Sequence, residues 1–442
     1  MQDIIVARAT PAGQGGVSII RLSGAELSNI ATELIGSLPA PRVAKYVKFK
    51  DAQNQTIDSG LAIFFPTPKS FTGEDVLEIH CHGSPIICDL LIERICSIGA
   101  RIAEPGEFSQ RAFLNDKIDL TQAEAVADLI GSTTATAARA ASRSLQGSFS
   151  RTVNELNDSV TKLRVNVEAA IDFPEEEIDF LKDQLLIDRL EQVSEEFSRV
   201  KNTIKQGCLL RDGAQVVIVG KPNVGKSSLL NAMVGKDVAI VTDIIGTTRD
   251  LVREDFEIKG VPIRIIDTAG LRETIDPVEK EGIRRANEAL AAADYALIVL
   301  DADTANPEEQ TQFLEALPDN LRYSFIWNKI DLIEKPPPKD KNNFLISALN
   351  GTGIEELRDH LVSQLGYEED DGAIIARRRH LESLKTAHQH FLEARRLLFE
   401  DSAGELMAEE LLQVQNALAD ITGQFSSDDL LGEIFSSFCI GK

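Results

Sequence analysis

Residues 220–227 have the sequence GKPNVGKS, which matches the phosphate-loop pattern that ends in Gly-Lys-Ser. Its two glycines allow a backbone path that points successive N–H groups at phosphate oxygens. The Lys226 ammonium can neutralise phosphate charge, and the Ser227 hydroxyl can bind Mg²⁺. An apolar run before the loop and a helix-like run after it predict the required strand–loop–helix setting. For this motif alone, the alternative is a glycine-rich turn before a helix.

A second motif, DTAG at residues 267–270, follows the apolar run 263–266. Its aspartate would emerge at the end of a strand, where it can hold Mg²⁺ through water, and the Gly270 N–H can reach a γ-phosphate. Thr247 and Thr248 lie between the two motifs, as a switch loop should. By spacing, we choose Thr248 as the second hydroxyl on Mg²⁺. A β-prone turn is the other interpretation of this threonine pair.

The identity of the base is predicted from NKID at residues 328–331 and SAL at residues 347–349, each of which follows an apolar run. The Asp331 carboxylate can accept hydrogen bonds from both N1–H and the 2-amino group of guanine. Adenine offers neither donor and would leave a polar group unpaired. The Ala348 N–H is the expected partner of the guanine carbonyl. The sequence therefore predicts that GTP, rather than ATP, is the ligand.

The catalytic residues depart from the common plan of such sites. Phosphoryl transfer needs an oriented water and positive charge against the phosphates, but Leu271 stands where many guanine-nucleotide switches carry glutamine. Arg272, Glu273, Asp276 and Glu279 follow within two helical turns, and one of these carboxylates could act on the water through a longer reach. Asn223 and the carbonyls of residues 242–246 supply neutral oxygens that suit a monovalent cation, which could replace an arginine. A solvated acidic helix face is the alternative for Glu279.

These segments together define one predicted nucleotide site. The predicted GTP contacts are Asn223, Val224, Gly225, Lys226, Ser227, Ser228, Thr242, Asp243, Ile244, Ile245, Gly246, Thr247, Thr248, Asp267, Thr268, Ala269, Gly270, Asn328, Lys329, Asp331, Ser347, Ala348 and Leu349. Because they come from separate segments, the fold must bring strand ends and loops to one place.

Charge and cysteine content constrain the setting of this site. The formal net charge is −24 and the sequence pI is about 4.7, which favours solubility and argues against broad capture of nucleic acid. Any RNA contact must be local, and residues 377–380 (RRRH) form the obvious basic cluster, although a solvated helix start is its default interpretation. Five cysteines without framework spacing, no signal segment and no membrane-spanning apolar stretch predict a cytoplasmic protein without membrane contact.

Two cysteine-containing segments invite a chemical interpretation. His80, Cys81 and His82 make a poor zinc site, because alternate strand residues point to opposite faces and no second ligand pair stands at suitable spacing. Cys439 lies four residues from the end of the chain, but Gly441 and Lys442 do not suit a prenylation signal. Its thiol could instead reach a neighbouring active site, and an incidental cysteine in a frayed tail is the alternative.

At 442 residues the chain exceeds one typical core and should form two or three domains. Residues 1–118 alternate β-rich runs with helix-like pieces, which predicts a small α+β domain. Helical patterns at 119–210 and 369–442 flank the nucleotide domain, 211–368, and neither half is obviously complete alone. The predicted fold class is therefore multidomain, α/β and α, with the nucleotide domain inserted into one discontinuous helical domain.

Local signals predict several helices. Thr121 and Glu124 have the spacing of a capping box. Apolar residues then recur every three or four positions across 145–171, until Pro174 breaks the run. A helix-like piece at 25–35 lies within the N-terminal domain, and a second helical block starts near residue 377 and continues to about residue 422.

These motifs resemble one family, the MnmE/TrmE tRNA-modification GTPases, and the resemblance covers the whole chain. Outside the nucleotide motifs, the matching segments are 9–16 (ATPAGQGG), 21–24 (RLSG), 71–75 (FTGED), 105–108 (PGEF), 113–117 (FLNDK), 169–174 (AAIDFP) and 439–442 (CIGK). Ala12 is a local departure, since a second proline is common there in the family, and it touches no proposed ligand. The resemblance implies an N-terminal domain of folate-binding type that also dimerises, and an inserted Ras-like P-loop GTPase domain.

The resemblance also implies an activity. It is that of a potassium-activated GTPase which, with the flavin-dependent partner MnmG (GidA), adds a carboxymethylaminomethyl or aminomethyl group to carbon 5 of the wobble uridine of certain tRNAs. The implied cofactors are GTP, Mg²⁺, K⁺ and 5-formyltetrahydrofolate or a related tetrahydrofolate, with FAD entering only through the partner. The implied assembly is a homodimer that pairs its G domains and forms a heterotetramer or larger complex with MnmG, acting on tRNA.

Single residues receive roles from the same resemblance. The implied roles are folate binding by Arg21, Glu78, Lys117 and Lys442; Mg²⁺ binding by Ser227 and Thr248; K⁺ binding by Asn223, Thr242, Ile244 and Thr247; and catalysis by Glu279, Arg272 and Cys439. Arginine and lysine can pair with folate carboxylates, and Glu78 can accept from a pterin ring. Glu279 would orient the attacking water through a second water, and K⁺ would supply the charge of the missing arginine.

Two other classes of function share the nucleotide motifs. A ribosome-assembly GTPase would be expected to carry a recognisable RNA-binding module, which the N-terminal region does not resemble. A regulatory GTPase acting only through partner binding would need no folate site. Folate binding therefore separates both alternatives from tRNA modification.

Overall fold

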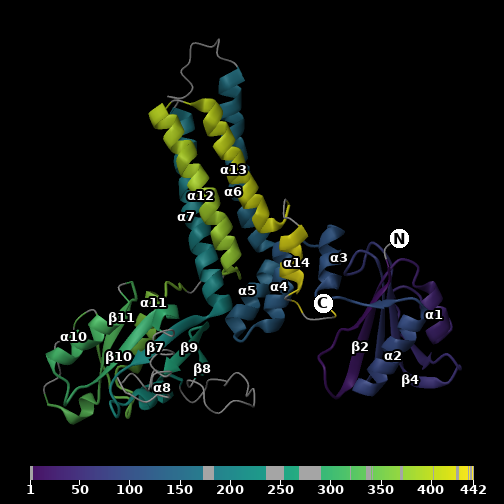
Figure 1. Ribbon diagram of the computed structural model, residues 1–442, viewed down its shortest axis with the longest axis horizontal. Coiled ribbons are helices and arrows are strands. Elements are labelled where there is room, and N and C mark those ends of the chain that lie inside the picture. The colour runs from purple at the N-terminus through teal and green to yellow at the C-terminus, as the bar shows by residue number, and fades with distance from the viewer. Residues whose placement is uncertain are drawn as a thin grey trace, which may run out of the picture. The chain divides into compact units, whose positions relative to one another are not determined.

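The structure is a computed structural model that describes residues 3–172, 184–234, 253–267, 290–318, 320–334, 340, 342–368, 372–401, 403–424, 428–436, 438 and 441. The chain divides into two compact units. The first contains Met1–Ala127, Leu145–Ile187 and Thr386–Lys442, and the second contains Asp128–Ser144 and Asp188–Lys385. Each unit is therefore assembled from segments that are distant in sequence (Figure 1).

The N-terminal part of the first unit is built on a mostly antiparallel sheet. In the order β3-β4-β5-β2-β1-β6, its strands are Lys45–Lys50, Thr56–Phe65, Asp75–Gly83, Gly15–Gly24, Ile5–Arg8 and Arg101–Ile102. Helices α1 (Ser28–Ile35) and α2 (Pro85–Ile98) pack against it (Figure 1). The predicted α+β arrangement is thus present.

Alternation along the central strands of this sheet separates its two faces. Ile20 and Leu22 on β2, and Leu77 and Ile79 on β5, are fully buried in the core that includes α1 and α2. The residues between them point to the other face, because strand side chains alternate. Arg21, which lies between Ile20 and Leu22, is therefore on the face of the sheet opposite this core.

Local details of the N-terminal part differ from the sequence-based expectation. Helix α1 begins at Ser28, not at residue 25, because Glu26 has a positive φ of 59° that is incompatible with a helix. Strand β3 was not predicted, although exposed Tyr46 and Lys48 alternate there with buried Val47 and Phe49. The capping-box interpretation of Thr121 is wrong. Asp119 accepts from the Gln122 N–H at 2.9 Å and Thr121 lies inside α4 (Leu120–Gly131).

A buried ion-pair network fixes helix α3 (Glu107–Leu114) to this domain. Arg111 donates to Glu74 at 3.0 Å and to Glu107 at 2.9 Å, and all these side chains are less than one-tenth exposed. Burial opposes ionisation of Glu107, but hydrogen bonds from Arg101, the Glu104 N–H and Arg111 hold the pKa of its carboxyl below the usual range. The ion pairs therefore hold α3 in one orientation, and each buried charge in them has a partner of opposite sign.

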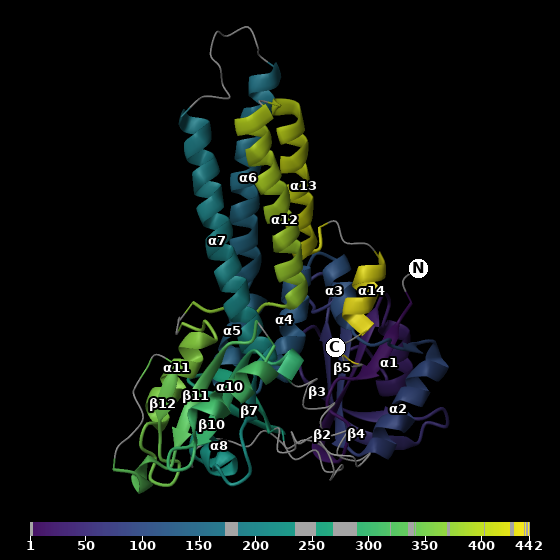
Figure 2. The same ribbon diagram turned by 60° about the vertical axis from the view of Figure 1, so that its left-hand side comes forward.

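The helical part of the first unit joins segments from both sides of the nucleotide domain. Helix α6 (Ser148–Asp172) lies beside α13 (Gly404–Thr422) in both views (Figures 1 and 2). Arg164 donates to Gln415 at 2.5 Å, and buried Val153, Val160 and Val167 follow the predicted apolar repeat. The helix α14 (Asp428–Ser436) contacts α3. None of the helices in the described ranges has the length and apolarity to span a membrane.

The second unit holds a six-stranded sheet in the order β12-β11-β10-β7-β9-β8. The strands are Asn343–Leu345, Tyr323–Asn328, Tyr295–Asp301, Ala214–Val219, Val261–Asp267 and Arg253–Ile258, and only β8 is antiparallel to its neighbour. Helices α8 (Lys226–Val234), α10 (Pro307–Ala316) and α11 (Ile354–Gln364) accompany it (Figure 1). The predicted strand–loop–helix setting of residues 220–227 is confirmed.

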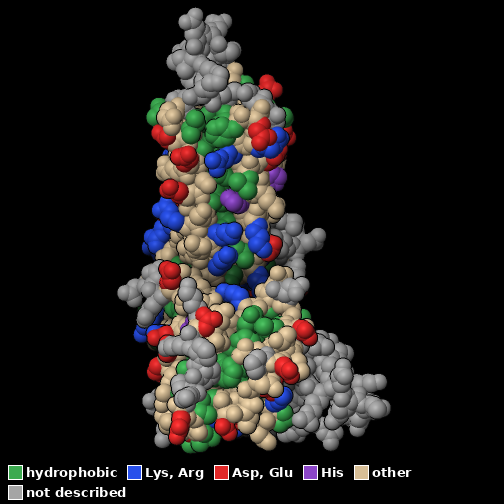
Figure 3. Space-filling view, turned by 90° about the vertical axis from the view of Figure 1, so that its left-hand side faces the viewer, with side chains coloured by type: hydrophobic (Ala, Val, Ile, Leu, Met, Phe, Trp, Pro, Cys, Tyr) green, Lys and Arg blue, Asp and Glu red, His purple; other side chains and the backbone are tan. Residues whose placement is uncertain are grey.

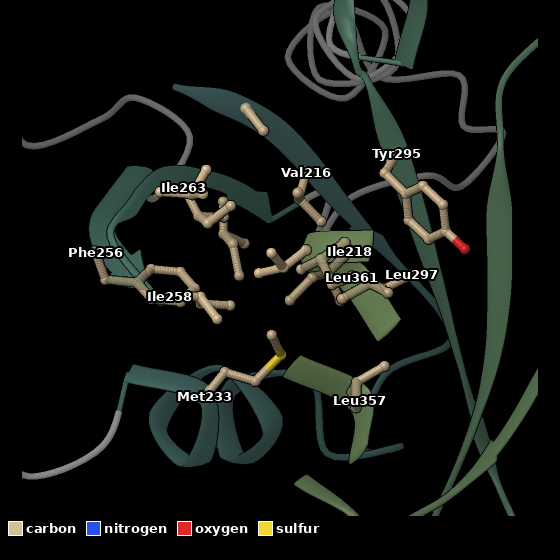
Figure 4. Packing of buried hydrophobic residues seen from close by; sticks show 14 of the residues in the cluster. Val216, Ile218, Met233, Phe256, Ile258, Ile263, Tyr295, Leu297, Leu357 and Leu361 are labelled. Atoms are coloured by element: carbon tan, nitrogen blue, oxygen red, sulfur yellow. The ribbon is translucent and has the colours of Figure 1, made fainter. Parts of the chain in front are cut away.

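Parallel strands covered on both faces explain the continuous apolar runs in this unit. Met233 of α8 and Leu357 and Leu361 of α11 pack against Val216 and its neighbours (Figure 4). The same core includes Ala140 and Ala141 of α5 (Ala135–Leu145), which lies outside the predicted span of the nucleotide domain. Helix α7 (Gln184–Asp212) leads into this core through buried Leu210.

Asp128 ties together the chain entering and the chain leaving the nucleotide domain. Its carboxylate accepts from Arg211, at the end of α7, and from Arg377, just before α12 (Arg378–Arg396), both at 2.9 Å. The Asp128 side chain is 6% exposed, and Arg377 is 13% exposed. The Ser144 hydroxyl reinforces this junction, since it donates to the Ile375 carbonyl at 3.1 Å and accepts from the Ile375 N–H at 3.0 Å.

This junction corrects the interpretation of residues 377–380 as a solvated basic cluster. Arg377 is paired with Asp128, and His380 is only 2% exposed, with its Nδ1 accepting from the Arg377 N–H at 3.0 Å. Arg378 is the exposed member, with 81% of its side chain accessible. Arg377 and His380 therefore stabilise the fold.

We expect Asp128→Ala to destabilise the second unit strongly. Removing the carboxylate leaves two guanidinium groups without their shared partner, a change that costs about 3–5 kcal/mol in buried pairs. One-third exposure of Arg211 favours the lower end, about 3 kcal/mol. Urea unfolding followed by tryptophan fluorescence measures the change, since Trp327 lies in β11. Asp158→Ala, which removes an exposed aspartate of α6, is the control, and equal effects of the two substitutions would contradict the expectation.

Candidate functional site

The nucleotide motifs of the described residues meet at one edge of the sheet in the second unit. Strands β7, β10, β11 and β12 run parallel, so their carboxyl ends share that edge. The phosphate loop follows β7, residues 328–331 begin at the end of β11, and residues 347–349 follow β12. Open parallel sheets bind ligands at this edge.

Two glycines of the phosphate loop are required by close packing. Gly225 has a φ of 96°, and a Cβ at this position would lie 2.2 Å from Nδ2 of Asn328. A Cβ on Gly220 would lie 2.5 Å from the carbonyl oxygen of Val299. A side chain at either position would force the loop away from the sheet edge, so these glycines set both the path of the loop and its contact with the base motif.

The polar residues of the loop are placed for contact with phosphate. Helix α8 begins at Lys226, so its N-terminal N–H groups and dipole face the loop. Nζ of Lys226 donates to the carbonyls of Gly220 at 2.8 Å and Lys221 at 3.1 Å. Ser227 and Asn223 are exposed, and Asn223 has a φ of 66°. Their oxygens are accessible to the cations expected there.

Asn328 joins the phosphate loop to the third segment of the site. Its side chain is buried, with Nδ2 donating to the Val224 carbonyl at 2.9 Å and Oδ1 accepting from the Ala348 N–H at 3.0 Å. The residue predicted to contact GTP thus works as a brace between two loops. The Ala348 N–H, the expected donor to guanine, therefore donates to the Asn328 amide in this structure.

Asp331 is exposed, whereas Asn328 is buried. Asp331 lies in the 3-10 turn η2 (Ile330–Leu332), and its side chain is exposed. The preceding Lys329 has a φ of 66°, which turns the chain out of β11 toward this position. Leu349 is 89% exposed. An exposed carboxylate next to a rigid brace can select a base by its hydrogen-bond donors, as the sequence predicts.

Several predicted site residues lie outside the described residues. They are Thr242, Asp243, Ile244, Ile245, Gly246, Thr247, Thr248, Thr268, Ala269, Gly270, Arg272, Glu279, Cys439 and Lys442. Strand β9 ends at Asp267, as predicted. Of the proposed Mg²⁺ and K⁺ ligands, the described ones are Ser227 and Asn223. No cluster of His, Cys, Asp and Glu within the described ranges has a metal-binding arrangement.

The second candidate site lies on the N-terminal sheet. Arg21 and Glu78 face each other across β2 and β5, and Nη2 of Arg21 lies 2.9 Å from Oε1 of Glu78. The guanidinium lies 5.6 Å from the ring centre of Phe71 and 5.9 Å from that of Phe108. The two predicted folate residues are therefore a preformed pair beside aromatic rings, on the sheet face opposite α1 and α2.

Lys117 and the C-terminal end approach the same domain. Nζ of Lys117 donates to the Pro68 carbonyl at 2.9 Å, in the loop that also carries Phe71. Gly441 has a φ of 97°, and a Cβ there would lie 2.2 Å from the carbonyl oxygen of Arg8, at the end of β1. Strand β1 is the neighbour of β2, which holds Arg21.

His80 is a neighbour of this site that we did not assign to it. It lies two residues after Glu78 on β5, so alternation alone could have placed both on one face. Its Nε2 is buried without a hydrogen-bond partner among the described residues, 3.5 Å from Oε2 of Glu78. Cys81 points to the core, and burial raises the pKa of its thiol to about 12. These orientations argue against a zinc site formed by residues 80–82.

Comparisons with known proteins match the whole length of the chain. Two family models match: the MnmE helical domain over residues 120–439, and the GTP-binding protein TrmE N-terminus over residues 4–117. The tRNA modification GTPase MnmE of Hydrogenovibrio crunogenus is 52% identical over 446 residues, covering 100% of this chain and 99% of that protein. That of Erwinia tasmaniensis is 53% identical over 450 residues, with the same coverage.

Solved structures match part of the chain. Era of Aquifex aeolicus bound to GDP and AlF4⁻ is 28% identical, covers 40% of this chain and 66% of its own, and has a TM-score of 0.30. The G domain of the FeoB iron transporter of T. maritima is 26% identical, covers 34% of this chain and 98% of its own, and has a TM-score of 0.27.

Proposed function

Because the chain belongs to the MnmE family of tRNA modification GTPases, we propose that it binds and hydrolyses GTP and acts in the modification of tRNA. The observation that carries this proposal is the buried Asn328 amide, which joins the phosphate loop to residues 347–349 beside exposed Asp331. Residues held together in this way do not have to be ordered when the ligand binds.

For catalysis we propose a potassium-dependent mechanism. Leu271 can neither orient water nor supply charge. By the family resemblance, Asn223 with Thr242, Ile244 and Thr247 would hold K⁺ near the phosphates. The position of Asn223 in the phosphate loop supports this assignment, since its side chain is exposed there. Glu279 would orient the attacking water through a second water, and pairing of G domains in a homodimer would complete the site. Ser227 and Thr248 would hold Mg²⁺.

We expect GTP hydrolysis to be faster in potassium than in sodium at matched ionic strength, by about tenfold or about 1.4 kcal/mol of transition-state stabilisation. Asn223→Ala should remove this difference because it removes a neutral oxygen ligand. Asn231→Ala, at an exposed position of α8, is the matched control and should retain it. Steady-state phosphate release in both salts measures the effect, alongside dimer formation with GDP and aluminium fluoride. Equal rates of the unaltered protein in both salts would reject the role of Asn223.

For tRNA modification we propose that the N-terminal domain binds a tetrahydrofolate one-carbon donor. The preformed Arg21–Glu78 pair beside Phe71 supports this, because a guanidinium and a carboxylate can pair with the carboxylates and ring donors of a folate. Lys117 and the C-terminal end at Gly441 approach the same domain, so Lys442 and, as a reactive thiol, Cys439 would act there. The flavoprotein MnmG would supply FAD and form the larger complex that modifies the wobble uridine.

Contact with tRNA would require a local concentration of positive charge. Lys and Arg side chains gather on part of the face drawn in Figure 3, despite the net charge of −24. Phosphate backbones bind to local groups of this kind. Filter binding of tRNA to this chain, with and without the flavoprotein, measures how much of the binding comes from this chain. No tRNA binding in either case would reject this part of the proposal.

Folate binding tests the proposed function against a ribosome-assembly or purely regulatory GTPase. We expect the full-length protein to bind 5-formyltetrahydrofolate and Arg21→Ala to weaken binding by about 10–100-fold, the range for loss of a charged hydrogen bond. Arg94→Ala is the matched control, because Arg94 also pairs with a carboxylate of this domain, Glu33, at 3.1 Å. Isothermal titration calorimetry measures both. Absence of folate binding by the unaltered protein would favour one of the alternative classes.

A further inference from the structure

Asp301 is a carboxylate at the nucleotide edge to which no motif assigns a role. It is the last residue of β10 and stands opposite Asn328 in the parallel register with β11. Its Oδ1 accepts from the Asp303 N–H at 3.1 Å, and its Oδ2 accepts from Nζ of Lys329 at 2.7 Å. The side chain is 15% exposed, so this ion pair is partly shielded from water.

The partner of Asp301 makes a second contact that reaches the phosphate loop. Nζ of Lys329 also donates to the carbonyl of Asn223 at 2.8 Å. Lys329 lies two residues before Asp331, the residue proposed to select guanine. The lysine therefore connects the base motif, the end of β10 and the phosphate loop.

Holding a lysine side chain in one orientation has an entropic cost. Its four-carbon stem has many rotamers, and this freedom is lost when the ammonium is fixed. Asp301 offsets that loss in the folded protein, because a charged hydrogen bond is stronger than a neutral one. A ligand that needs Lys329 in this orientation then binds to a site that is already organised.

We propose that Asp301 is a positioning residue for the guanine nucleotide, acting through Lys329. This rests on the proposed binding of GTP and adds a residue outside its motifs. Asp301 holds the Lys329 ammonium against the Asn223 carbonyl. This contact keeps the distance between the phosphate loop and the turn that carries Asp331 constant. The alternative is that Asp301 only caps the turn at residues 302–304.

Asp301→Asn separates these two roles. Asparagine retains the Oδ1 acceptor for the Asp303 N–H and nearly the same volume, but it removes the negative charge from the atom that holds Lys329. Asp303→Asn is the matched control, because it removes the same charge from an exposed side chain two residues away. Lys329→Met removes the ammonium and keeps an unbranched stem.

The experiment measures dissociation of fluorescent mant-GDP from the full-length protein by stopped flow with excess GDP and Mg²⁺. We expect Asp301→Asn to release mant-GDP about tenfold faster, equivalent to about 1.4 kcal/mol, and Asp303→Asn to match the unaltered protein. If Asp301 acts through Lys329, adding Asp301→Asn to Lys329→Met should change the rate by less than about twofold. The steady-state KM for GTP should rise with kcat unchanged at saturation.

Two results would overturn the inference. One is an unaltered release rate in Asp301→Asn, and a lower melting temperature of the nucleotide-free variant in that case assigns Asp301 to the turn alone. The other is the full tenfold effect persisting in the Lys329→Met background. Failure of the unaltered protein to bind mant-GDP would instead reject the proposed function and this inference with it.

Discussion

Replacing Glu279 with alanine should abolish GTP turnover while leaving GTP affinity close to that of the unaltered protein. The expected fall in kcat is about 10²–10⁴-fold, the range supplied by a positioned general acid or base. The physical reason is that Leu271 offers no polar atom for the attacking water, and the family resemblance assigns the orientation of this water to the Glu279 carboxylate. Single-turnover phosphate release and titration with a non-hydrolysable GTP analogue measure the two quantities separately.

The control for this substitution comes from the same segment. Asp276→Ala removes a nearby carboxylate of the same sign, and it should leave kcat within about twofold, because only Glu279 is assigned to the attacking water. If both substitutions reduce turnover equally, the effect comes from the charge of the whole segment and Glu279 has no separate role. If Glu279→Ala weakens GTP binding in proportion to turnover, it acts in ground-state binding instead.

Asp331→Asn should change the base that the protein accepts. Aspartate accepts from two donors of guanine, whereas asparagine presents an amide N–H to the 2-amino group and leaves polar groups unpaired. We expect kcat/KM for GTP to fall by about 10⁴-fold, as in sites built around specific hydrogen bonds. Xanthosine triphosphate has a carbonyl at the 2-position that can accept from the amide, so it should become the better substrate. Turnover of both nucleotides by each protein measures the change.

The exposed position of Asp331 makes this substitution a clean test of recognition. Because the side chain is exposed in η2, the substitution should leave the melting temperature of the nucleotide-free protein unaltered. Glu334→Gln, which neutralises another exposed carboxylate three residues later, is the matched control and should keep the preference for GTP. A variant that loses both nucleotides equally would show that Asp331 supports the pocket rather than reads the base.

Local motifs explain why so much of the nucleotide site could be predicted from the sequence. The phosphate loop needs consecutive backbone N–H groups, and the base motif needs a carboxylate just beyond a strand, so each chemistry is encoded within a few adjacent residues. The parallel strands that hold them also appear as continuous apolar runs. In the N-terminal domain the strands were predicted less completely, because the lysine-rich β3 resembles a solvated segment.

Roles that depend on partners far along the chain were not predictable in this way. Asn328 has the sequence position of a ligand-binding residue, but its partners Val224 and Ala348 make it a brace. Arg377 appears as part of a basic cluster, yet its partner Asp128 lies 249 residues earlier.

The sequence by itself determined the family resemblance, the order of the nucleotide motifs and the need for a substitute for glutamine at Leu271. These depend on residue type and short spacing. Only the tertiary structure decided that Asp301 holds Lys329, that Arg21 is already paired with Glu78, and that Asp128 joins both connections of the nucleotide domain. The reason is geometric: hydrogen bonds and ion pairs act over a few ångströms, and no local periodicity records which distant segments the core brings within that range.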